Sequence, residues 1–152
     1  MKTLKILVFI LLFFTTNAQN KNYFNDYKEL AKQMEDTYKI PSCVILAVGY
    51  IESGGGISQV GKRLNNHFGI VGSSQPAISG YKSRYRYYPT VKDSFIGFCE
   101  LVCSKKFYEG LKGSDDRNKW VKSLAATGYA GDANKWSAKV IGIMNKYCNQ
   151  SK

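Results

Sequence analysis

The stretch CVILAVGYIESGGG, from Cys43 to Gly56, decides the fold of this chain. Its first part is apolar on every side of a helix, which predicts a helix buried at the centre of the domain rather than one lying on its surface. Pro41 and Ser42 precede it, with Ser42 as the expected N-cap, and the glycines that begin at Gly54 end it. A helix of this kind has to be surrounded by other elements.

Glu52 is carried by this apolar helix into the glycine-rich turn. Partial burial raises the pKa of a carboxyl group, and the dipole at a helix C-terminus disfavours a negative charge. A surface glutamate with no function is the alternative, and the unfavourable dipole argues against it. A general acid needs a carboxyl group that keeps its proton near neutral pH, so we predict that Glu52 is a general acid.

The rest of the chain predicts a mainly α (α+β) domain. The spacing of apolar residues predicts an amphipathic helix over about 22–38, and Thr90 with Asp93 forms a capping-box-like start for a helix that reaches about residue 105. Shorter helices are expected at 106–111 and 117–126, and Asp132 caps a last helix over 133–148. Residues 67–89 alternate short β-prone pieces with turn residues, which predicts a small β-hairpin lobe. The expected architecture is a lysozyme-like helical domain around a buried central helix.

Residues 1–18 have the pattern of a secretory signal peptide, with two lysines, an apolar run and a small-residue exit after Ala18. The apolar run is too short to span a membrane. We therefore expect one domain over 19–152, secreted or periplasmic and monomeric, with no integral membrane segment. The chain carries 22 basic and 11 acidic residues. This excess suits an anionic wall polymer or lipid, and nucleic acid is not expected because no nucleic-acid-binding signature is present.

The four cysteines are Cys43, Cys99, Cys103 and Cys148. An even number in an exported chain predicts disulfides. We favour pairing of Cys99 and Cys103 each with one of Cys43 and Cys148, and the sequence does not decide which. A metal site is not expected, because the cysteines lack zinc-site spacing. A cysteine peptidase built from Cys43 and His67 is a weak alternative, and His67, the only histidine, is interpreted as a partly exposed residue of the lobe.

Four motifs occur in an order that resembles a known family. They are YIESGGG (50–56), NNHFGIV (65–71), YRYYPTVKDSF (85–95) and LAATGYAGDANKWSAKVI (124–141). Together they resemble the N-acetylglucosaminidase domain of glycoside hydrolase family 73, which cleaves bacterial peptidoglycan. The resemblance runs from about residue 27 to residue 147, nearly the whole exported chain.

The resemblance implies a set of site residues. Glu52 would be the catalytic acid, and Tyr129 would match a family tyrosine that faces the acetamido group of the substrate. The segment with Asn65, Asn66 and Phe68 would form the floor of the site, although Phe68 is equally well explained as core. The residues expected to bind or act on substrate are therefore Glu52, Tyr129, Asn65, Asn66 and Phe68, with no cofactor. Tyr88 joins them as part of an aromatic-rich stretch.

The stretch YKSRYRYYP, which contains Tyr88, has two interpretations. Its aromatic rings could form a platform for sugars, with Arg84 and Arg86 reaching substrate carboxylates. Alternatively, it could be a tyrosine-rich hairpin that simply packs on the helices.

The chain departs from the family in its carboxylates. Many members use, or are proposed to use, a second carboxylate from the β lobe, but no acidic residue lies between Glu52 and Asp93 here. Asp93 is better placed as a helix cap. Either it serves as the second carboxylate, or the substrate's acetamido group assists, or activity is weak.

From Glu52 and the four motifs together, we predict an endo-β-N-acetylglucosaminidase acting on peptidoglycan strands. The alternatives are a lytic transglycosylase and a non-catalytic wall-binding module.

Overall fold

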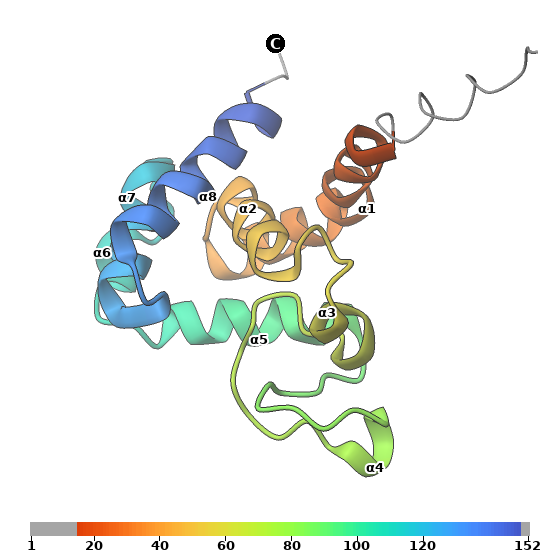
Figure 1. Ribbon diagram of the computed structural model, residues 1–152. Coiled ribbons are helices and arrows are strands. Elements are labelled where there is room, and N and C mark those ends of the chain that lie inside the picture. The colour runs from red at the N-terminus through yellow and green to blue at the C-terminus, as the bar shows by residue number, and fades with distance from the viewer. Residues whose placement is uncertain (1–14, 150–152) are drawn as a thin grey trace, which may run out of the picture.

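The computed structural model describes residues 15–149, with side chains from Tyr23 onward. Most of the predicted signal peptide, residues 1–14, lies outside the described residues. Figure 1 shows the helices of this part of the chain. Their bounds are α1 Thr15–Tyr38, α2 Ser42–Ser53, α3 Gln59–Leu64, α4 Pro76–Ser79, α5 Val91–Cys103, α6 Tyr108–Leu111, α7 Arg117–Leu124, the π-helical turn η1 Ala125–Tyr129 and α8 Ala133–Tyr147.

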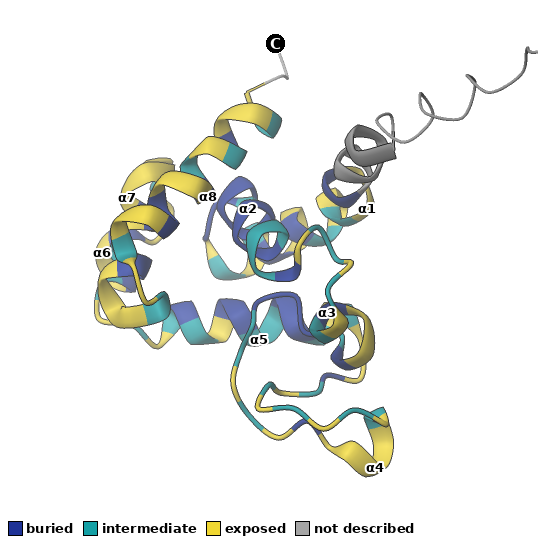
Figure 2. Ribbon diagram, viewed as in Figure 1, coloured by how far each residue is buried: buried dark blue, intermediate teal, exposed yellow. Residues whose placement is uncertain are grey.

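Helix α2 is the centre of the fold, as its sequence predicts. It packs against α1, α7 and α8, and Figures 1 and 2 show it between α1 and α8 with almost no exposed surface. Every residue from Cys43 to Gly49 is buried. Burial on all sides explains why this helix has no polar face.

Gly49 lets two aromatic side chains approach α2 closely. A Cβ atom at this position would lie 2.5 Å from the Tyr23 hydroxyl of α1 and 3.2 Å from the ring of Phe68. Glycine is therefore needed here for space rather than for its backbone freedom, since Gly49 lies inside a regular helix.

The two ends of α2 are formed differently from each other. Gly54 ends the helix in the left-handed conformation (φ 59°) and donates to the carbonyl of Tyr50, as the glycine run predicts. The expected N-cap at Ser42 is wrong, because Ser42 is already helical and Pro41 takes the cap position without a side-chain hydrogen bond. The carbonyl of Pro41 accepts the first amides of the helix, and its ring fixes φ near the value required.

The caps predicted for α5 and α8 are confirmed. The Thr90 hydroxyl accepts from the Asp93 amide, and the Asp93 carboxylate accepts from the Thr90 amide, so the capping box is complete. Asp132 accepts from the amide of Lys135 and starts α8. These caps satisfy amides that have no partner inside their helices.

The predicted β-hairpin is wrong. We call residues 54–92 the lobe; among them only one isolated antiparallel bridge forms, between Val71 and Tyr85. The Asn66 side chain explains why the pairing stops there, because its Oδ1 accepts from the amide of Ile70 and its amide donates to the carbonyl of Arg86. A side chain that takes this donor and this acceptor replaces the backbone bond that would extend the ladder. The short helix α4 then separates the two segments, and Figure 1 shows it at the far end of the lobe, away from α8.

The expected cysteine pairing is also wrong. Cys43 and Cys148 form a disulfide with Cα atoms 6.1 Å apart, whereas Cys99 and Cys103 are both free. Because α2 and α8 pack together, the start of one helix meets the residue that follows the other. Cys99 lies on α5 and is fully buried in the hydrophobic core of the domain.

His67 is buried, with 2% of its surface exposed, and is not the partly exposed residue that we expected. Its Nδ1 lies 3.1 Å from the Tyr23 hydroxyl, and its ring stacks on Tyr23 and meets Tyr27 edge-on. Burial lowers the pKa of His67 to about 4. The histidine is therefore a neutral core residue that ties the lobe to α1.

Among residues 15–149, none of the helices combines the length and the apolar character that a bilayer-spanning helix requires.

Candidate active site

The site is built where the end of α2 meets the start of α8. Glu52 lies in the last turn of α2, and Trp136 lies in the first turn of α8. The indole Nε1–H of Trp136 donates a 2.6 Å hydrogen bond to Oε1 of Glu52. Trp136 is 8% exposed, so its ring is locked in the core while its N–H group fixes one oxygen of the carboxyl group.

Glu52 is half-buried, and its surroundings favour the protonated form. Desolvation raises its pKa, and the hydrogen bond from Trp136 lowers it by a smaller amount. Two causes therefore oppose each other, and burial is the larger. The position of Glu52 at the C-terminal end of α2 acts in the same direction as burial, because the helix dipole disfavours a negative charge there.

The second oxygen of Glu52 faces the turn at Gly69. A Cβ atom on Gly69 would lie 3.3 Å from Oε2, and Gly69 has a positive φ of 63°. Glycine is thus needed at this position for both its conformation and its small size. Asn66 holds this turn, since its Oδ1 accepts from the amide of Ile70 and its amide donates to the carbonyl of the same residue.

Tyr129 contacts the same turn. Its hydroxyl donates a 2.7 Å hydrogen bond to the carbonyl of Phe68, and its ring centroid is 5.4 Å from that of Trp136. Burial, together with the nearby Glu52 carboxylate, raises the pKa of Tyr129 far above its ordinary value, so the hydroxyl stays protonated.

A π-helical turn places Tyr129. The turn η1 follows α7 directly and contains Gly128 with φ 79°, after which Ala130 is extended. Turns of this kind are rare inside helices and occur often at functional sites, where they direct a side chain that a regular helix would misplace.

Glu52, Tyr129 and the turn that carries Phe68 are brought together as the motifs predict. The ring of Phe68 is 1% exposed and stacks on Phe98, so its backbone carbonyl, and not its ring, contacts another site residue. Asn66 is also buried, and its amide is fully used on backbone groups. Contact of these two side chains with substrate stays a prediction.

Asn65 and Tyr88 lie together on the lobe. The Asn65 amide donates to the carbonyls of Tyr88 and Pro89, and Asn65 itself ends α3 in the left-handed conformation. The Tyr88 ring is 6% exposed and its hydroxyl packs against Gly97 of α5 without a hydrogen-bond partner. Direct contact of Tyr88 with a sugar also stays a prediction.

The carboxylate of Asp93 is engaged in the helix cap. One of its oxygens, Oδ2, accepts from both the amide (3.0 Å) and the hydroxyl (2.7 Å) of Thr90. In residues 15–149 no group of three or more His, Cys, Asp or Glu side chains is arranged to hold a metal ion.

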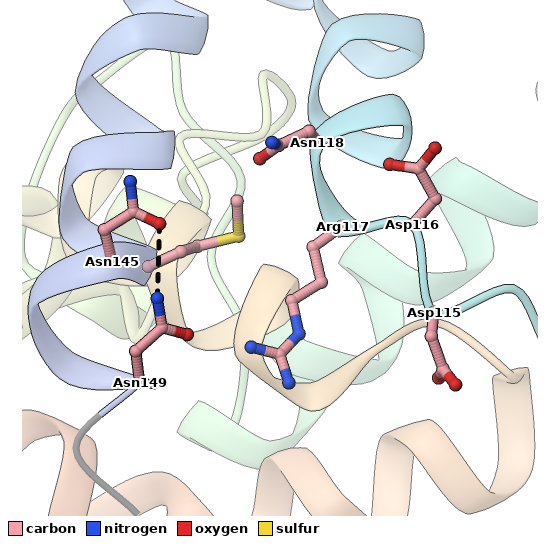
Figure 3. Close-up of a pocket in the computed structure, with 7 residues that line it drawn as sticks. Asp115, Asp116, Arg117, Asn118, Asn145 and Asn149 are labelled. Carbon is pink, nitrogen blue, oxygen red and sulfur yellow. Dashed lines mark hydrogen bonds between the residues drawn. The ribbon is translucent and has the colours of Figure 1, made fainter.

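Figure 3 shows a separate hollow between the start of α7 and the end of α8. It has a volume of about 330 Å³ and is lined by Asp115, Asp116, Arg117, Asn118, Met144, Asn145 and Asn149. None of the predicted site residues lines it. Asn145 follows Trp136 by more than two helical turns along α8, so this hollow is distinct from the Glu52 site.

Trp136 is the site residue that sequence reasoning missed, since its spacing on α8 indicated only a core position. The available signal was chemical, because a buried indole N–H needs an acceptor. Nothing in the spacing could show that the acceptor lies 84 residues away, on Glu52.

Comparison with known protein families gives a match over most of the chain. Residues 28–149 match the family model of Glucosaminidase, which is described as mannosyl-glycoprotein endo-beta-N-acetylglucosaminidase. The matched region contains all the site residues named above. A sequence comparison with curated proteins gives no match.

Several solved structures share the fold. The catalytic domain of the autolysin Auto from Listeria monocytogenes is 19% identical, with a TM-score of 0.69 over 86% of this chain and 85% of that one. A truncated glycoside hydrolase domain of FlgJ from Salmonella typhimurium is 18% identical, with a TM-score of 0.68 over 87% and 99%. A peptidoglycan hydrolase from Sphingomonas sp. A1 is 20% identical, with a TM-score of 0.66 over 82% and 87%.

Proposed function

Because the chain belongs to the glucosaminidase family, glycoside hydrolase family 73, we propose that it is an exported endo-β-N-acetylglucosaminidase acting on peptidoglycan. It would cleave the β-1,4 bond between N-acetylglucosamine and N-acetylmuramic acid. The observation that supports this most directly is the environment of Glu52, whose pKa is raised by burial while Trp136 holds Oε1 at 2.6 Å. The enzyme would act outside the cytoplasm as a monomer without a cofactor.

The geometry supports different roles for the two oxygens of Glu52. Since Oε1 accepts the indole N–H, the proton of the neutral acid resides on Oε2, on the side of the Gly69 turn. Oε2 would donate this proton to the glycosidic oxygen while the C1–O bond breaks and its electron pair moves to that oxygen.

We propose that the substrate supplies the second catalytic group. No acidic residue lies between Glu52 and Asp93, and Asp93 is engaged by Thr90. The acetamido oxygen of N-acetylglucosamine would bond to C1 as the leaving group departs, giving a cyclic cation. Water would then open the ring, with the Glu52 carboxylate accepting the proton, and the configuration at C1 would be retained.

Tyr129 would orient the acetamido group. Its hydroxyl hydrogen is used on the carbonyl of Phe68, which leaves its oxygen as an acceptor for the acetamido N–H. This role would place the acetamido oxygen next to C1. Residues Asn65, Asn66, Phe68 and Tyr88 would support the site through the lobe that they hold together.

Digestion of purified peptidoglycan tests the proposed function. The wild type should release muropeptides with reducing N-acetylglucosamine ends, and Glu52→Gln should lose about a thousandfold in rate, the middle of the range for a general acid. Asp132→Asn, which changes an acidic cap residue in the same way, is the matched control and should keep its rate. Equal clearing by the wild type and Glu52→Gln would remove Glu52 from this role.

A lytic transglycosylase is the second candidate, because a site with a single usable carboxylate is also sufficient for that reaction. Mass spectrometry of the same digest distinguishes the two. Muropeptides with 1,6-anhydro ends would identify a transglycosylase. If neither the wild type nor Glu52→Gln clears the peptidoglycan, a wall-binding module would be favoured.

A further inference from the structure

The lobe is the longest segment of this chain that carries positive charge alone. Residues 54–92 contain no aspartate or glutamate and have six basic residues, all of them exposed. These are Lys62, Arg63, Lys82, Arg84, Arg86 and Lys92. Three of the four arginines in the sequence are among them.

The cations of the lobe have no carboxylate partner. Within residues 15–149 the ion pairs are those of Lys32 with Glu35 and with Asp36, on α1. Arg63 instead lies over the ring of Tyr81, and Arg84 lies over the ring of Tyr85. Stacking on an aromatic face holds a guanidinium in place while leaving the N–H groups at its edge free to donate.

The arginine segment is fixed relative to the catalytic carboxyl group. The backbone amide of Arg86 donates to the carbonyl of Ile70, and the side-chain amide of Asn66 donates to the carbonyls of both Ile70 and Arg86. Ile70 directly follows Gly69, which packs against Oε2 of Glu52. The backbone that carries Arg84 and Arg86 is thus hydrogen-bonded to the segment that follows the Gly69 turn, which faces Oε2 of Glu52.

A fixed relation to Glu52 matters only for a ligand that occupies both places at once. A free anionic polymer needs only a charged surface, whereas a carboxylate attached to the strand being cut arrives at a set distance from the scissile bond. Guanidinium groups bind carboxylates through paired N–H donors, which lysines cannot do. Peptidoglycan carries such carboxylates on its peptide stems.

We propose that the lobe, through Arg84 and Arg86, binds the carboxylates of the peptide stems on the glycan strand that Glu52 cleaves. This inference rests on the proposed function. It makes the enzyme selective for strands that still carry peptides. It also assigns to the lobe a role in substrate choice in addition to its structural support of the Gly69 turn.

The test measures binding without turnover, so that it does not depend on activity. Glu52→Gln protein is sedimented with three insoluble materials freed of other wall polymers: intact peptidoglycan, the same material with its carboxylates amidated, and glycan strands stripped of peptides. We expect binding to intact material to be about tenfold tighter than to the other two, and Arg84→Gln with Arg86→Gln to abolish that difference.

The matched control is Lys28→Gln with Lys119→Gln, which removes the same charge from exposed positions on α1 and α7. It should leave the tenfold preference intact. Equal binding to all three materials would overturn the proposal, as would a loss of the preference in the control. A wild type that binds with this preference but releases no muropeptides would instead contradict the proposed hydrolase function while supporting the lobe's role.

Discussion

Trp136 and Glu52 are joined by a 2.6 Å hydrogen bond that connects the first turn of α8 to the last turn of α2. This contact has two effects on the carboxyl group of Glu52. It fixes the direction of one oxygen, and it lowers a pKa that burial raises. The pH dependence of the proposed reaction should therefore depend on Trp136 as well as on the burial of Glu52.

Replacing Trp136 by phenylalanine should change the pH profile. The ring is kept and the N–H donor is lost, so the pKa of Glu52 rises further. A general acid works below its pKa, so the alkaline limb of kcat/KM should move to higher pH, while the rate falls about tenfold, the value of one hydrogen bond to a charged group.

Trp120→Phe is the matched control, since the indole N–H of Trp120 donates to the carbonyl of Ser114, away from the site. Trp120→Phe should lower the melting temperature without moving the alkaline limb of kcat/KM. An alkaline limb that stays in place in Trp136→Phe would show that Trp136 has only a packing role.

Asp93→Asn should separate capping from catalysis. The Asp93 carboxylate accepts two hydrogen bonds from Thr90, so its neutralisation should cost about 1 kcal/mol of unfolding free energy. The rate on peptidoglycan should stay within about twofold of the wild type, because a general acid or base would contribute at least a hundredfold. Denaturant unfolding and muropeptide release measure the two effects. A rate loss as large as that of Glu52→Gln would identify Asp93 as the second catalytic carboxylate.

His67 should make the fold sensitive to acid. Its pKa is about 4 in the folded chain and 6.5 when unfolded. The unfolded chain therefore binds more protons between these values, so stability falls as the pH drops from 6.5 to 4, by about 3 kcal/mol, and the loss stops below 4.

The chain has a single histidine, so NMR of its imidazole gives the folded pKa without assignment. Unfolding of wild type and His67→Phe at several pH values then isolates its contribution from that of the carboxylates. A folded pKa near 6.5 would contradict the buried, neutral ring.

Gly49→Ala should destabilise the packing of α1 on α2. The added methyl group would meet the Tyr23 hydroxyl at 2.5 Å and the Phe68 ring at 3.2 Å, both on buried side chains. Overpacking costs about 1 to 3 kcal/mol, which outweighs the helix propensity that alanine gains. Gly142→Ala on α8 is the control, because its Cβ meets nothing within 4 Å, and it should stabilise by about 0.5 to 1 kcal/mol. Thermal melts compare the two. Equal shifts would show that the space at Gly49 is not limiting.

The helical part of the fold could be predicted because its signals are local. The apolar run from Val44 to Val48 indicated burial on all sides, and Thr90, Asp93 and Asp132 marked helix starts that the structure confirms. The lobe could not be predicted in the same way. Its backbone pairing depends on one side chain, that of Asn66, which bonds to carbonyls up to 20 residues away.

The wrong predictions for His67 and for the cysteine pairing have a related cause, because both depend on contacts between residues far apart in the sequence. His67 is polar and lies in a glycine-rich segment, which favoured exposure, yet three aromatic residues of α1 and α5 enclose it: Tyr23, Tyr27 and Phe95. The cysteine pairing depended on which helix ends meet in space. Motif order was sufficient to predict that Glu52 and Tyr129 belong to one site, but the turn that links them through Phe68 required the structure.

The bond between Cys43 and Cys148 joins the same two helices that supply the acid and its indole partner. The two cysteines are 105 residues apart. A disulfide that closes a loop of this length restricts the unfolded chain and stabilises the fold by about 4.7 kcal/mol. Before oxidation, these helices are held together by side-chain packing and by the hydrogen bond from Trp136 to Glu52. If the chain is exported as proposed, the candidate site would therefore gain this stabilisation only when the chain reaches an oxidising compartment.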